Sequence, residues 1–305
     1  IRRDRGKILE LFSQLDNLWV PAWNSNRGIQ RIHKPLDDPP LFTPLSSRER
    51  HFRSEFLLEV SRGCPSECSF CAACHLNKPT RFRSRHSLIE TLSRFLPDRI
   101  RQVGLVGAAL AFHPELKNLL NDFLNLNLQA HLSSLRPEII DHELCRLLDR
   151  HQVKTITLAP ETGNDQDRLT LNKRLTNQKI VDSIRILSES ASVRELKLYF
   201  MLGFDFDDEV QKIAELTGMI QARFTRKITL SVTPFIPKQR TPFQNRPFCD
   251  PIRLKRMYQE LKKLFPAGRS QVQLNLFSIR QSALQAELSS NPDALMGSEN
   301  KNSRS

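Results

Sequence analysis

The chain has 305 residues, of which 39% are hydrophobic and 26% charged, and it carries a formal net charge of +13. β/α barrels commonly use this length for one domain. No apolar run is long enough to span a membrane and nothing resembles a secretory signal, so we expect a cytoplasmic protein without a membrane partner. The basic charge favours an anionic substrate or a partner such as RNA, but it is dispersed and no aromatic-rich RNA-binding segment accompanies it.

The pattern of the chain divides it into three regions. Residues 1–50 are rich in proline and charge, and we expect a linker or the tail of a preceding domain. From about residue 55, apolar runs alternate with segments of helical periodicity, which predicts parallel α/β structure. The predicted strands are 56–60, 102–106, 128–132, 155–158, 196–201 and 228–232. The predicted helices are 88–96, 115–124, 137–148, 180–188, 209–220 and 251–264. Residues 281–305 are polar, and we expect a disordered tail.

Three cysteines follow the first predicted strand. Cys64, Cys68 and Cys71 form the pattern C-x3-C-x2-C, directly after the apolar run 55–60 and a turn at 61–63. A cubane iron–sulfur cluster normally takes four thiolates, so three would leave one iron free to bind another ligand. An open coordination position is typical of catalytic metal sites.

A fourth cysteine, Cys74, keeps a second interpretation open. With the first three it would close a zinc site or a four-cysteine cluster, in an electron-transfer or RNA-binding module. Cys145 and Cys249 lie far away in the chain, and we expect them to be packing residues. Disulfides are not expected, because an oxygen-sensitive cluster belongs in a reducing compartment.

The cysteine loop resembles the signature of the radical S-adenosylmethionine (SAM) superfamily, C-x3-C-x-aromatic-C, with Phe70 as the aromatic residue. The resemblance implies a 4Fe-4S cluster held by Cys64, Cys68 and Cys71, with SAM chelating the fourth iron and Phe70 near its adenine. It also implies a partial (β/α)6 TIM-like barrel, which we expect over residues 51–280. The six predicted β/α units match that architecture.

Active-site groups of a parallel barrel cluster at the carboxyl ends of its strands. The second predicted strand runs into Gly107, where many superfamily members carry Gly-Gly-Glu, but Ala108 and Ala109 depart from that motif. Gly107 is expected to let the backbone approach SAM, or else to form a tight turn. Ser133 and Arg136 end the third strand; Arg136 would pair with the SAM carboxylate, and the alternative is a helix-capping role here.

The fourth strand end reads Ala-Pro-Glu-Thr-Gly, with Glu161 directly after a buried strand, where a carboxylate needs a partner. This segment resembles radical SAM proteins with an amino-terminal cobalamin-binding domain. The resemblance assigns Glu161 to the ribose hydroxyls, and Met201 and Gly203 at the fifth strand end to the adenine. We expect that preceding domain to be absent from these 305 residues, so cobalamin would be a cofactor only of a longer parent protein.

These patterns predict a radical SAM enzyme. An external one-electron reductant would reduce the cluster, and SAM would be cleaved to methionine and a 5′-deoxyadenosyl radical that abstracts hydrogen from an unknown substrate. Methyl transfer and methylthio transfer are among the outcomes that the resemblance allows.

Overall fold

The computed structural model describes residues 4–15, 18, 20, 23, 36, 41, 42, 56–268 and 271–290. The chain divides into two compact units, Ile1–Asp38 and Pro39–Ser305. In the first unit, helix α1 (Arg5–Ser13) begins at Asp4, whose carboxylate accepts the Gly6 N–H at 3.0 Å. Most of residues 1–50 lies outside the described residues, so their assignment as a linker or tail stays a prediction.

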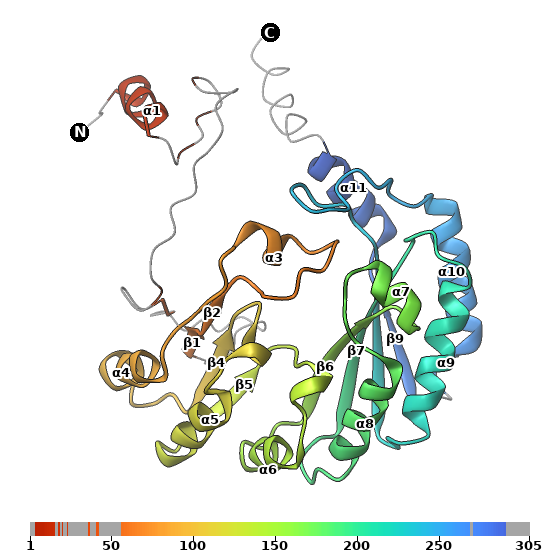
Figure 1. Ribbon diagram of the computed structural model, residues 1–305, viewed down its shortest axis with the longest axis horizontal. Helices are drawn as coiled ribbons and strands as arrows, with labels where there is room; N and C mark the ends of the chain where they lie inside the picture. Colours follow the sequence, from red (N-terminus) through yellow and green to blue (C-terminus); the bar gives the residue numbers. More distant parts are fainter. Residues whose placement is uncertain are drawn as a thin grey trace. The chain divides into compact units, whose positions relative to one another are not determined.

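The second unit is built on parallel strands that follow one another in chain order (Figure 1). The first sheet contains β1 (Phe56–Glu59), β4 (Gln102–Val106) and β5 (Gln129–Leu132). The second contains β6 (Thr155–Glu161), β7 (Glu195–Leu202), β8 (Lys227–Pro234) and β9 (Val272–Leu276). The Leu135 N–H donates to the Thr157 carbonyl at 2.9 Å and joins the two sheets.

The α/β partial-barrel prediction is confirmed, and all six predicted strands are present. Strand β9 was not predicted. It is a short edge strand in which Gln273 and Asn275 alternate with Val272, Leu274 and Leu276, a pattern that is typical of a half-buried strand and that the sequence analysis overlooked.

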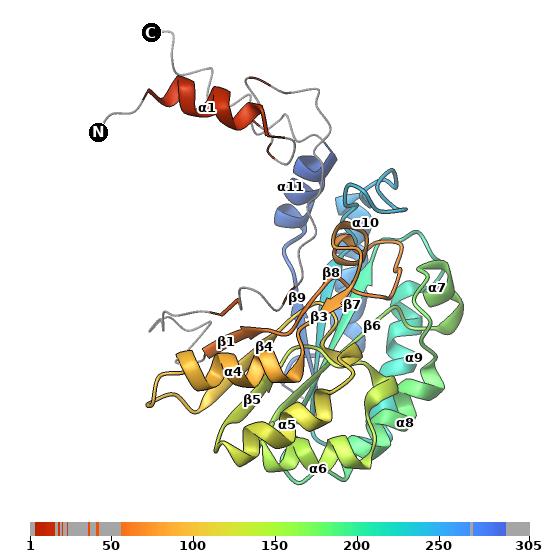
Figure 2. The same ribbon diagram turned by 60° about the vertical axis from the view of Figure 1, so that its left-hand side comes forward.

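Six long helices cover the outer face of the sheets (Figures 1 and 2). They are α4 (Arg85–Phe95), α5 (Leu116–Asn125), α6 (His142–Arg150), α8 (Asn177–Ser188), α9 (Glu209–Gln221) and α10 (Pro251–Leu264). Helix α8 shows why they form: Thr176 caps its first turn, and Ile180, Ile184 and Leu187 recur on one face and are fully buried. Burying each such side chain stabilises the fold by about 1.5–3 kcal/mol.

The inner face of the second sheet is polar. In β7, Leu198 and Phe200 are fully buried in the core beneath the helices, whereas Tyr199 between them is 37% exposed. Barrel interiors are usually filled with branched apolar side chains. Lys197 pairs in register with Thr157, and Tyr199 with Ser231, so residues with hydrogen-bonding groups occupy this face along the first half and the middle of the strands.

The expectation of disorder from residue 281 onward is wrong for 281–290. Helix α11 (Ile279–Ser290) packs against α10 and β8, and buries Ser282 and Ala286. The buried residues of α11 are small, so the segment has no run of large apolar side chains and its sequence suggested a polar tail. Residues 291–305 lie outside the described residues. Among the described residues, no helix combines the length and apolar character needed to cross a membrane.

Candidate active site

The cysteine loop leaves the sheet through strand β2 (Ser61–Arg62), which pairs antiparallel with β3 (Arg81–Phe82) at the loop's other end. Gly63 has φ +84°, and a Cβ there would lie 2.3 Å from the Asn77 carbonyl oxygen, so only glycine fits this turn. Cys68 is 7% exposed, while Cys64 and Cys71 are half-buried. The loop therefore holds three thiols beside the carboxyl ends of the strands.

Cys74 takes a different position. It lies in the short helix α3 (Ala72–Leu76), which was not predicted, and its thiol donates to the carbonyls of Cys71 (3.0 Å) and Cys68 (3.5 Å). The His75 Nε2 also lies 2.9 Å from the Cys68 carbonyl oxygen. Cys74 thus supports the backbone of the loop.

The thiols differ in acidity. The Cys74 thiol also lies against the Cys71 sulfur. Hydrogen bonds to the Cys71 thiolate from this thiol and from the backbone N–H groups of Cys74 and Ala73 lower the pKa of Cys71 to about 6, and the contact between the two thiols, with burial, raises the pKa of Cys74. Burial raises the pKa of Cys68 to about 11, against the opposing effect of the Lys173 ammonium. Because metal ligands are thiolates, Cys71 is the thiol most ready to bind.

Throughout the described residues, no group of three or more histidine, cysteine or acidic side chains is arranged to hold a metal ion. Tetrahedral zinc draws its thiolates within about 2.3 Å of one ion. A cubane cluster binds each cysteine to a different iron, so its ligands stand farther apart. Three cysteine thiols on one loop are the donor set that such a cluster takes.

Glu161 lies at the end of β6 and is buried together with its partner. The Lys173 ammonium donates to Glu161 Oε1 at 2.8 Å, and the two side chains are 10% and 13% exposed. Glu161 has φ +70°, which a non-glycine residue rarely adopts. Both charges act on the Cys68 thiol, so this ion pair lies beside the cysteine loop. The partner that the sequence analysis required for Glu161 is therefore Lys173 within the protein itself.

Arg136 also lies against the cysteine loop. Its Nη1 donates to Ser66 Oγ at 2.9 Å, and its guanidinium stacks 4.9 Å from the centre of the Phe112 ring. It makes no side-chain cap for the following 3₁₀ turn, η2 (Pro137–Ile139), so the helix-capping alternative is wrong for Arg136. Ser133 is exposed beyond the end of β5. Arg136 and Lys173 both line a pocket of about 310 Å³. The full lining is Pro65, Ser66, Glu67, Phe112, Arg136, Asn172, Lys173 and Arg174.

The residues predicted for the adenine lie together. Phe70 and Met201 pack against one aromatic cluster, made of Leu171, Phe204, Phe235 and Phe243. The Phe70 and Phe204 rings are 6.3 Å apart. Gly203 is next to Phe204 and has φ +90°. These positions are far apart in the chain, and the fold brings them to one side of the cysteine loop.

Glu209 has a role that the sequence analysis missed. It is the first residue of α9, and its buried carboxylate accepts the N–H groups of Gly203 (2.8 Å), Phe206 (3.3 Å) and Phe204 (3.4 Å). Burial raises the pKa of Glu209 in spite of these bonds. Glu209 therefore holds the turn after β7 in shape.

Gly107 is required by packing. A Cβ at this position would lie 2.2 Å from Ser61 Oγ, because the end of β4 crosses closely beside β2. This contact accounts for the glycine at the base of the cysteine loop, and the expected contact with SAM stays a prediction.

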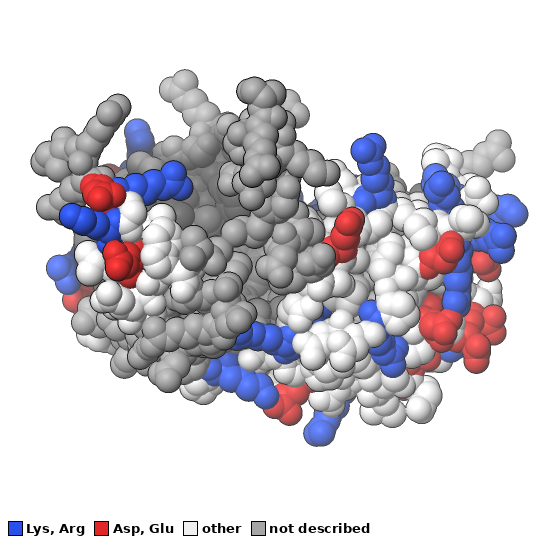
Figure 3. All heavy atoms as spheres, turned by 90° about the horizontal axis from the view of Figure 1, so that it is seen from above, with Lys and Arg blue, Asp and Glu red and all other residues white. Residues whose placement is uncertain are grey.

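Charges on the upper face are mixed. Figure 3 looks onto the molecule from above the view of Figure 1 and shows Lys and Arg side chains scattered, with Asp and Glu among them.

The fold and the site define a partial β/α barrel with a three-cysteine loop at the carboxyl ends of its strands. The model of the radical SAM superfamily matches residues 58–217. The chain belongs to the radical SAM superfamily.

One sequence relative and two solved structures are similar to the chain. An uncharacterized protein of Methanocaldococcus jannaschii is 31% identical over 216 residues, which are 70% of this chain and 47% of that protein. The chain thus spans about half the length of this curated relative. The radical SAM methyltransferase TsrM from Kitasatospora setae, solved with cobalamin and a 4Fe-4S cluster, has a TM-score of 0.51 at 13% identity, over 62% of this chain and 38% of that one. Methylornithine synthase (PylB) has a TM-score of 0.50 at 16% identity, over 77% and 69%.

Proposed function

We propose that the protein is a cytoplasmic enzyme that binds a 4Fe-4S cluster through Cys64, Cys68 and Cys71 and cleaves SAM reductively. The observation that carries the proposal is a difference among the four cysteines. Cys64, Cys68 and Cys71 carry free thiols on one loop, whereas the Cys74 thiol on the following helix donates hydrogen bonds to the backbone carbonyls of Cys68 and Cys71. Such a donor set leaves an iron for SAM. When bound and reduced by an external donor, the cluster supplies the electron that splits SAM into methionine and a 5′-deoxyadenosyl radical.

The chain's own residues bind and orient SAM in this proposal. Glu161 accepts hydrogen bonds from the ribose hydroxyls, and Phe70, Met201 and Gly203 border the adenine. Gly107, Ser133 and Arg136 receive the amino and carboxylate groups. The support is the proximity of the aromatic cluster, the Glu161–Lys173 pair and Arg136 to the same loop. The buried cluster around Phe204 excludes water from the carbon–sulfur bond of SAM that is cleaved.

The inner face of the sheet is the proposed substrate side. Tyr199 precedes Met201 by two residues, about 7 Å along the strand, so a substrate over its ring lies within reach of a nucleoside at the strand end. Tyr199 and Lys197 share this face with the hydroxyls of Thr157 and Ser231. These groups favour a small polar substrate with an anionic group bound to Lys197. Cobalamin would join only in a longer parent protein.

Anaerobic reconstitution followed by a SAM-cleavage assay tests the proposal. The reduced protein should convert SAM to 5′-deoxyadenosine, measured by liquid chromatography with mass spectrometry. Cys71→Ser should abolish the product. Cys145→Ser, which replaces a buried thiol on the outer helix α6, is the matched control and should retain it. Reconstituted wild-type protein that holds a cluster and yields no 5′-deoxyadenosine would instead favour the closed-site electron-transfer function.

A further inference from the structure

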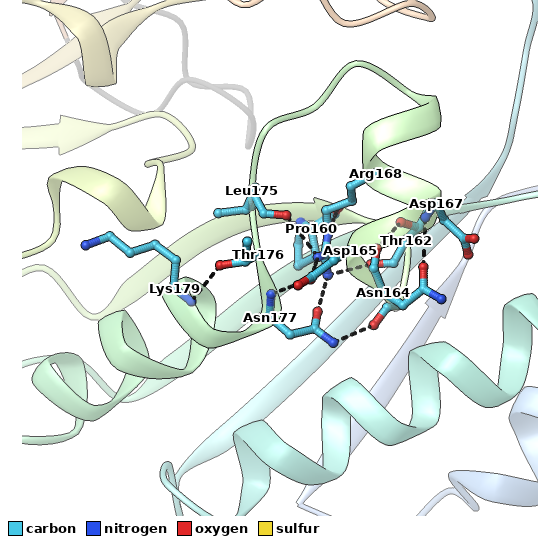
Figure 4. Close-up of polar contacts among 11 residues, drawn as sticks. Pro160, Thr162, Asn164, Asp165, Asp167, Arg168, Leu175, Thr176, Asn177 and Lys179 are labelled. Atoms are coloured by element: carbon cyan, nitrogen blue, oxygen red, sulfur yellow. Dashed lines mark hydrogen bonds and ion pairs between the residues drawn. The ribbon is translucent and has the colours of Figure 1, made fainter.

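Arg168 is the largest fully buried side chain in the described part of the protein, with no exposed surface. It lies on the short helix α7 (Asp165–Thr170), and all five N–H donors of its guanidinium are used (Figure 4). Its acceptors are the Pro160, Thr162 and Leu175 carbonyls, each at 3.1 Å, the Asp165 carboxylate at 2.8 Å, and the Asn177 side-chain oxygen.

Two of these bonds enclose Glu161. Nε of Arg168 donates to the carbonyl just before Glu161, on Pro160, and Nη2 donates to the carbonyl of Thr162 just after it. Glu161 itself has φ +70°, a conformation that costs a non-glycine residue about 1–3 kcal/mol and persists only where the surroundings enforce it. The two bonds provide that enforcement.

The other bonds hold the segment that carries Lys173. Arg168 donates to the Leu175 carbonyl and to Asn177, and its own carbonyl accepts the Lys173 N–H at 2.8 Å. One side chain therefore determines the backbone on both sides of the Glu161–Lys173 ion pair.

A plain packing role accounts poorly for this residue. Burial of a guanidinium is costly, and apolar side chains of similar volume often stabilise a core as well or better. A lysine would supply the charge but lacks the planar fork that serves five acceptors at once. The acceptors of Arg168 are concentrated on the two backbone segments of the ion pair.

We infer that Arg168 is a positioning residue for SAM binding: it holds Glu161 in its left-handed conformation, with Lys173 opposite, so that the carboxylate is aimed at the ribose hydroxyls. This inference rests on the proposed function. Arg168 touches neither cofactor, and it acts through Glu161.

The test compares Arg168→Lys with Arg226→Lys. Arg226 also donates to two backbone carbonyls, those of Val193 and Ser188, but it precedes β8 at the opposite end of the sheet. The measured quantity is the affinity for S-adenosylhomocysteine, by calorimetry on reconstituted protein, together with iron content. Arg168→Lys should weaken binding about tenfold, equal to about 1.4 kcal/mol, at unchanged iron content. Arg226→Lys should leave the affinity unchanged.

A double-variant comparison isolates the route of the effect. If Arg168 acts through Glu161, adding Arg168→Lys to Glu161→Gln should weaken binding no further than Glu161→Gln alone. Additive losses, or unchanged affinity in Arg168→Lys, would overturn the inference. Asp165→Asn is a milder second variant, because Asp165 is half-exposed and contributes one of the five acceptors; it should weaken binding by roughly threefold.

Hydrogen exchange gives a readout that is independent of any cofactor. In metal-free protein, Arg168→Lys should speed exchange in the peptide that contains Glu161 and Thr162, and leave the peptides of α5 and α6 at wild-type rates. Wild-type protein that binds no S-adenosylhomocysteine would overturn the proposed function, and hydrogen exchange would then decide the positioning role by itself. Equal exchange in variant and wild type would refute that role.

Discussion

The Glu161–Lys173 ion pair offers a sharp test of the site. Lys173→Met keeps the length of the side chain and removes the ammonium 2.8 Å from the carboxylate, in a place where both side chains are at least 87% buried. Removing one partner of a buried pair costs about 3–5 kcal/mol, because the remaining charge stays buried without compensation. We expect the free energy of unfolding of the metal-free protein to fall by about 3 kcal/mol. For a slope of about 3 kcal/mol per molar, the urea midpoint then falls by about 1 M.

The double variant Lys173→Met with Glu161→Gln is the control. It removes both charges, so the free energy of unfolding should recover to within about 1 kcal/mol of the wild-type value. Losses that simply add, or a wild-type midpoint in Lys173→Met, would contradict a buried ion pair, because they would mean that the two side chains do not interact in a buried site.

Three further predictions concern the surroundings. Gly163→Ala should destabilise the protein by about 2 kcal/mol or more, because its Cβ would lie 2.1 Å from the Lys212 backbone; the matched Gly218→Ala, where a Cβ meets no atom within 4 Å, should stabilise α9 by up to about 1 kcal/mol in urea unfolding. Burial lowers the pKa of His151, so the unfolded chain binds the proton more readily; stability should fall as the pH drops through about 6.5, by at most about 1.4 kcal/mol per unit, and His151→Gln should show a shallower fall. Iodoacetamide labelling of metal-free Cys71 should rise with pH and be half-maximal near its pKa of about 6. A midpoint near 9 would contradict the hydrogen bonds that Cys74 and Ala73 make to the Cys71 thiolate.

Local patterns in the sequence predicted much of this fold. The six strands and the outer helices have strong apolar periodicity, and the three thiols share one short loop, so neighbouring residues carry the information. Strand β9 carries a local alternating pattern that was overlooked, whereas helix α11 packs on α10 and β8 through small side chains that give it little apolar periodicity.

The sequence indicates the candidate ligands of the site more readily than the residues that support them. The spacing of Cys64, Cys68 and Cys71 predicts them as cluster ligands. The supporting roles of Arg168, Glu209 and Cys74 could not be read from the sequence, because their acceptors are backbone groups whose positions depend on turns. One signal was available for Arg168, namely an arginine seven residues after a carboxylate at a strand end.

Electron paramagnetic resonance of the reduced cluster tests the open coordination position most directly. Spectra are compared before and after addition of SAM, in the wild-type protein and in Cys74→Ser, whose hydroxyl can still donate to the loop carbonyls. We predict that the cluster forms in both proteins and that SAM changes the spectrum in both. Loss of the cluster in Cys74→Ser, with a wild-type spectrum indifferent to SAM, would show that Cys74 closes the site.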